Sequence, residues 1–101
     1  MEQLLKQIQE LSEQEQKTLE QMVLKLSEEV GETAQAVLSY KKASGSEYKK
    51  LTKADVKEEC ADVILVALTL FFKLSETDKE LDEFLSKKIK KWSAIIPLKE
   101  E

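Results

Sequence analysis

Two groups of acidic residues are spaced so that their side chains could meet around a common partner. The segment KLSEEVGETAQAV carries Glu28, Glu29 and Glu32, and the segment EECADVILVAL carries Glu59 and Asp62. On a helix, residues three apart lie on the same face, so each segment contains a facing pair of carboxylates. Such carboxylates can bind a divalent cation or exchange protons with a substrate.

The helical periodicity places these carboxylates at the edges of apolar faces. On a helical wheel Glu29 lies beside Leu26, and Glu59 lies beside Val56, so both border faces that should pack against other helices. An ionised carboxylate at such a contact is costly unless it is paired or bound to a cation. Glu28 points further toward solvent.

Chance spacing is the alternative explanation. Glutamate is abundant in this chain, and Glu10/Glu13 and Glu80/Glu83 have the same separation without any sign of a site. By spacing alone, a solvated acidic surface is the more common outcome. The position beside apolar faces is what favours a cation site.

The residue types that are absent restrict the chemistry. The sequence has no histidine, and all 16 basic residues are lysine, so imidazole can serve neither as a general base nor as a metal ligand. The single cysteine, Cys60, excludes an intrachain disulfide, and its neighbours predict a small buried residue. Oxygen ligands alone favour Mg²⁺, with Mn²⁺ as a possible substitute. Mg²⁺ usually binds a few carboxylates and the phosphates of a substrate, which indicates phosphoryl or nucleotidyl chemistry.

The two acidic segments resemble a known family. Glu28-Glu29-x-x-Glu32 followed by Glu59-x-x-Asp62 is similar to the EExxE…ExxD pattern of the MazG-like, all-α nucleoside triphosphate pyrophosphatases. The resemblance covers roughly residues 19–92. It implies Mg²⁺-dependent hydrolysis of a (d)NTP to a (d)NMP and pyrophosphate, with a house-cleaning role against surplus or non-standard nucleotides.

The resemblance also implies roles for individual residues. Glu29, Glu32, Glu59 and Asp62 would hold the metal. Glu28 would be the catalytic carboxylate, binding a further metal or orienting the attacking water. The superfamily includes dUTPases and phosphoribosyl-ATP pyrophosphohydrolases, which remain alternative activities. A non-catalytic helical interaction module is the alternative from another class.

The last helical segment supplies candidate substrate contacts. Family members carry basic and amide residues there that face the phosphates, and this chain offers Lys88, Lys91 and Trp92. The chain contains no asparagine, unlike many relatives, so the resemblance does not assign its phosphate and base contacts. A solvated lysine face beside a core tryptophan is the competing interpretation of these residues.

The elements that position these residues are all helical. Leucine, lysine, glutamate and alanine abound, glycine occurs twice and proline once, and no strand-like alternation appears. Apolar residues at three- and four-residue steps predict a short first helix and three longer ones. The cap spacing of Ser12 and Glu15 predicts a new helix or a kink there, and Thr52 and Asp55 predict the start of the third helix. Residues 43–51 are the predicted loop.

The apolar run from Val63 to Phe72 predicts a second copy of the chain as partner. It is apolar on all sides, so more than one face must be covered. We expect Leu65, Leu68 and Phe72 to meet another subunit, with coverage by the first helix as the alternative. The chain is therefore expected to form one domain, residues 1–101, in a homodimer or a dimer-of-dimers tetramer with a helical-bundle core.

Other partners are not indicated. The net charge of −4 gives no reason to expect a nucleic acid polymer. The longest apolar run is too short to span a bilayer, so no membrane is expected. The first ten residues lack the pattern of a signal peptide. We expect a cytoplasmic protein that binds a (d)NTP.

Overall fold

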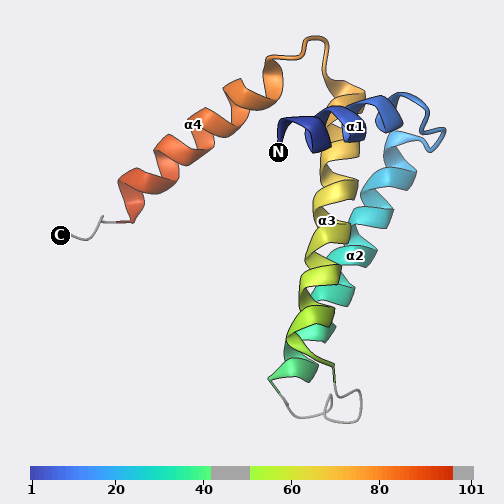
Figure 1. The fold of residues 1–101 in the computed structure, drawn as a ribbon, viewed down its shortest axis with the longest axis vertical. Coiled ribbons are helices and arrows are strands. Elements are labelled where there is room, and N and C mark those ends of the chain that lie inside the picture. Colours follow the sequence, from blue (N-terminus) through green and yellow to red (C-terminus); the bar gives the residue numbers. More distant parts are fainter. Residues whose placement is uncertain (42–50, 97–101) are drawn as a thin grey trace.

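The computed structural model describes residues 1–41 and 51–96, and these residues contain four helices and no strand (Figure 1). The helices are α1 (Glu2–Glu13), α2 (Leu19–Tyr40), α3 (Lys53–Leu74) and α4 (Glu80–Ile95). The all-α prediction is confirmed. The predicted loop lies outside the described residues, apart from Leu51 at its end.

Capping boxes set the start of the two long helices. At α2 the Thr18 hydroxyl accepts a hydrogen bond from the Gln21 backbone N–H, and the Gln21 side chain accepts one from the Thr18 N–H. Thr52 and Asp55 form the same box at α3, which confirms that prediction. Each box satisfies backbone donors that a helix start leaves free.

The predicted helix start at Ser12 is wrong. Ser12 lies inside α1, where it is buried and its hydroxyl donates a hydrogen bond to the Gln9 carbonyl at 2.6 Å. Its hydroxyl therefore donates to a carbonyl of the preceding turn and does not cap a new helix. The Thr18-x-x-Gln21 spacing was the signal for the true start.

Helices α2 and α3 run side by side as a long antiparallel pair (Figure 1). Among the described residues, the buried hydrophobic ones are Met22 and Ala36, and both are on α2. At the loop end the Leu51 N–H donates to the buried Ser39 hydroxyl at 3.1 Å. This bond ties the chain just before α3 to the end of α2, and so helps to set the register between the two helices.

Helix α1 crosses the other end of the pair and packs on α3 (Figure 1). Leu68 and Phe72 are half-buried, and the Gln9 side chain of α1 donates to Asp78 beyond the end of α3 at 2.8 Å. Leu65 remains 48% exposed. Helix α1 therefore covers part of the apolar face of α3, as the alternative prediction expected.

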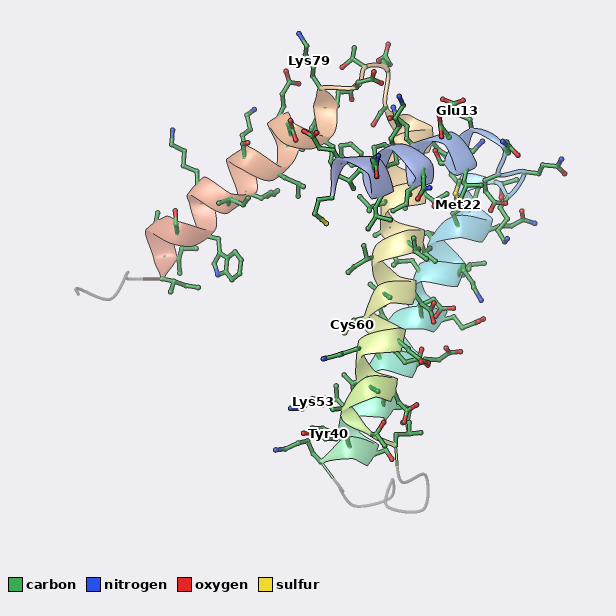
Figure 2. All side chains as sticks on the ribbon, in the orientation of Figure 1. Glu13, Met22, Tyr40, Lys53, Cys60 and Lys79 are labelled. Atoms are coloured by element: carbon green, nitrogen blue, oxygen red, sulfur yellow. The ribbon has the colours of Figure 1, made fainter. Side chains whose placement is uncertain are left out.

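Helix α4 projects away from the other three helices (Figure 1). Near its start Phe84 meets Phe71 of α3 edge to face, with ring centroids 5.6 Å apart. Beyond that point its side chains stand clear of the α2–α3 pair (Figure 2). The apolar residues along α4 are consequently exposed, and Trp92 is 64% exposed. Trp92 is not a core residue of the subunit.

The single chain exposes more surface than a compact monomer of its length. Its accessible surface is 8579 Å², whereas a compact monomer of this size exposes about 5,800 Å². Cys60 belongs to this exposed surface, so the prediction of a buried cysteine is wrong for the subunit. It lies partway along α3 (Figure 2), on a face that neither α1 nor α4 covers.

Candidate metal centre

The α2–α3 pair brings the five predicted acidic residues together. Two groups can each offer ligand oxygens that lie within 4.8 Å of one another: Glu28, Glu29 and Glu32 form one group, and Glu29, Glu59 and Asp62 form the other. Glu29 belongs to both groups. It therefore links the carboxylates of α2 with those of α3.

The distances between these oxygens are compatible with carboxylates that share one small divalent cation. Mg²⁺ binds oxygen at about 2.1 Å, so two ligands on opposite sides of one ion lie about 4.2 Å apart. Adjacent ligands of one ion lie closer, about 3.0 Å apart, so small side-chain rotations would be needed for the members of either group to share an ion. Because Glu29 is shared, the arrangement could hold one ion or two.

Two oxygens in the cluster are buried without a hydrogen-bond partner among the described residues. They are Oε2 of Glu29 and Oε2 of Glu59. Glu29 is only 6% exposed, so solvent does not compensate its charge. A buried carboxylate oxygen with no partner is costly, and a bound cation removes that cost. This observation separates the cluster from an ordinary acidic surface.

Lys25 is a member of the cluster that sequence reasoning missed. Its ammonium lies 3.0 Å from Oε1 of Glu29 and 3.1 Å from Oε1 of Glu28. The hydrogen bonds to Glu29 and then to Glu28 raise the pKa of Lys25 well above its ordinary value. The spacings i, i+4 and i, i+3 on α2 could have revealed it.

The environment of Glu59 favours its neutral form. Burial is the largest cause that raises the pKa of its carboxyl above 4.5, followed by a hydrogen bond with the Glu32 side chain. Repulsion by the charges of Glu32, Asp62 and Glu29 acts in the same direction.

This raised pKa predicts that metal-free protein becomes more stable as the pH falls from neutral through the pKa of Glu59. The sign follows because a raised pKa means that the folded state binds the proton more tightly than the unfolded state. The gain should be complete below about pH 4.5, the pKa of an ordinary glutamate. Thermal melts in a chelator, comparing wild type with Glu59→Gln, measure it. If both proteins respond identically to pH, Glu59 is not the titrating group.

A cavity of about 320 Å³ opens beside the carboxylates. Glu28, Gly31, Glu32 and Glu59 contribute to its lining. A Cβ atom added to Gly31 would meet nothing within 4 Å among the described residues. Glycine inside a helix costs about 1 kcal/mol relative to alanine. Close packing among the described residues does not explain why a glycine is present here. Because Gly31 lines the cavity and has no side chain, it leaves additional room there.

The structure does not bring the predicted substrate contacts to this cluster within one subunit. Lys88, Lys91 and Trp92 are exposed on α4, which points away from the α2–α3 pair (Figure 1). Their role remains a prediction that requires another copy of the chain or a different placement of α4.

Fold and site together define a class: an all-α protein in which two antiparallel helices gather carboxylates at a candidate cation site. The comparison with protein families agrees. Residues 17–94 match the family described as the MazG nucleotide pyrophosphohydrolase domain. The chain therefore belongs to the MazG nucleotide pyrophosphohydrolase family. No curated protein and no solved structure shows a significant match.

Family membership confirms the resemblance seen in the acidic motifs, and its matched range includes both of them. It places the chain among hydrolases that act on the phosphoric anhydrides of nucleotides. Within residues 1–41 and 51–96, no helix has the combination of length and apolar character needed to cross a membrane.

Proposed function

We propose that this protein is an Mg²⁺-dependent nucleoside triphosphate pyrophosphohydrolase that converts a (d)NTP to a (d)NMP and pyrophosphate. The observation that carries the proposal is the buried, unpartnered oxygen of Glu29 at the centre of two carboxylate groups. Family membership supplies the reaction class. The removal of surplus or non-standard nucleotides in the cytoplasm is the role that fits this reaction.

The five carboxylates would have different roles according to their positions. Glu29, Glu32, Glu59 and Asp62 would hold the cation between the helices. A bound Mg²⁺ offsets the charge of the triphosphate and lowers the pKa of a bound water. Glu28 is exposed and lies on the rim of the cavity. It would orient the attacking water or bind a second ion.

A substrate panel tests the proposal. Wild-type protein is incubated with each of the eight common NTPs and dNTPs, with Mg²⁺, with Mn²⁺ or with a chelator, and pyrophosphate release is measured. We expect release from at least one nucleotide, and only with the metal. The proposal fails if no nucleotide is hydrolysed and Mg²⁺ does not shift the melting temperature. We add dUTP as a ninth compound and phosphoribosyl-ATP as a tenth, so that the identity of the best substrate separates a general enzyme from a dUTPase-like or a phosphoribosyl-ATP-directed one.

The space beside Gly31 gives a second test of the same site. We expect Gly31→Ala to raise the free energy of unfolding by about 0.5–1 kcal/mol, because alanine restricts the unfolded chain and favours helix. If substrate uses the space, KM should rise at the same time. Urea unfolding and steady-state kinetics measure the two effects. A stabilised variant with unchanged KM would show that substrate does not approach Gly31.

We also propose that the functional unit is a homo-oligomer, at least a dimer. An apolar groove runs along α2 and α3 on the side away from the acidic cluster, and it is lined by Val30, Thr33, Ala34, Cys60, Val63 and Ile64. The surface in excess of a compact monomer is about 2,800 Å² per chain. Specific interfaces bury about 800 Å² per partner, so the excess suffices for one or two of them.

A further inference from the structure

The ammonium of Lys25 contacts Glu29, the carboxylate shared by both candidate ligand groups, and Glu28 beside it. It lies 3.0 Å from one oxygen of Glu29 and 3.1 Å from one oxygen of Glu28. The other oxygen of Glu29 is buried without a partner among the described residues. Lys25 therefore compensates the acidic cluster only in part.

Lysine and a divalent cation compete for these oxygens. A carboxylate oxygen that accepts a hydrogen bond from an ammonium at 3.0 Å has to reorient or give up that contact to bind Mg²⁺ at about 2.1 Å. The Lys25 side chain is free to leave, because it is 43% exposed and its four-carbon stem is flexible. The same exposure leaves the ammonium accessible to an anionic group bound beside Glu28 and Glu29.

We propose that Lys25 is a positioning residue with two successive partners. In metal-free protein it neutralises Glu28 and Glu29. When a divalent cation binds Glu29, the ammonium gives up that contact and transfers to the phosphate oxygens of the substrate, which would lie next to the cation. This inference rests on the proposed function, because it requires a cation and a polyphosphate at the same site.

Binding of Mn²⁺ in the absence of nucleotide tests whether Lys25 and the cation compete for the carboxylates. Removing a positive charge about 4 Å from the ion should tighten Mn²⁺ binding by on the order of tenfold in Lys25→Met. Electron paramagnetic resonance of free Mn²⁺ measures this affinity without any turnover. Lys73→Met is the matched control, since Lys73 lies in the last turn of α3, away from the cluster, and should leave the affinity unchanged.

Binding of tripolyphosphate to Mn²⁺-saturated protein tests whether Lys25 then contacts the phosphate oxygens. We expect Lys25→Met to weaken it by about tenfold, because a charge-assisted hydrogen bond is lost. Lys25→Arg keeps the charge and should restore most of the tripolyphosphate affinity. The opposite signs for the two ligands are the signature of a lysine that exchanges partners, and a merely structural lysine would not produce them.

The outcomes distinguish this inference from the proposed function. If wild-type protein binds neither Mn²⁺ nor tripolyphosphate with Mn²⁺, the proposed function fails. If wild type binds both but Lys25→Met shows no tighter Mn²⁺ binding, or no weaker tripolyphosphate binding, the partner exchange is overturned and the metal site stands. Circular dichroism of each variant confirms that the helices are retained.

Discussion

The Glu29→Gln variant should lose at least about 100-fold in kcat/KM for pyrophosphate release, because Glu29 is the one carboxylate common to both ligand groups. Replacing a group that merely orients a metal ligand already costs 10- to 100-fold. Glutamine has nearly the same shape, so the packing at this buried position is retained. The variant therefore tests the charge of Glu29 and not its volume.

Stability should respond in a different way from activity. Glu29→Gln loses the ion pair with Lys25 but also removes a buried charge whose second oxygen has no partner. These effects oppose one another, and we expect the free energy of unfolding in a chelator to change by no more than about 1 kcal/mol. In wild type Mg²⁺ should raise the melting temperature, and in the variant this shift should be largely lost.

The matched control is Glu10→Gln, which makes the same chemical change at an exposed position on α1. It should leave kcat/KM and the Mg²⁺-dependent melting shift unchanged. Retention of near wild-type activity by Glu29→Gln would remove Glu29 from the metal centre. It would also withdraw the main support for the proposed mechanism.

The Ile64→Lys variant should be predominantly monomeric at concentrations where wild type is an oligomer. Ile64 is 55% exposed in the subunit and lines the apolar groove between α2 and α3. A lysine buried in an interface without a partner costs several kcal/mol, which weakens association by more than about 100-fold. Sedimentation velocity at micromolar concentration measures the change.

Leu24→Lys is the control for this prediction. Leu24 lies on α2 outside the residues that line the groove, and it is 69% exposed. The same substitution there should leave the sedimentation coefficient unchanged. A wild-type protein that is a stable monomer at micromolar concentration would overturn the oligomer itself, and with it the predicted role of the groove.

The long helices were predictable because their signals are local. Thr52 and Asp55 are three residues apart, and a capping box depends only on such neighbours. Ser12 shows the limit of that reasoning. Its spacing to Glu15 has the form of a box, but a serine hydroxyl can also donate to the preceding turn of its own helix. Which of the two occurs depends on where the helix ends in three dimensions.

The sequence by itself determined the all-α class and the family, and it singled out the five acidic residues as candidates, because helical periodicity and the EExxE…ExxD spacing are properties of neighbouring positions. Only the tertiary structure decided that Glu29 is the buried member shared by two ligand groups, that Lys25 already contacts it, and that α4 stands apart from the site. Burial and contact between helices depend on how α2 packs against α3. The register of that packing is set by long-range contacts, such as the bond from Leu51 to Ser39, which no local pattern records.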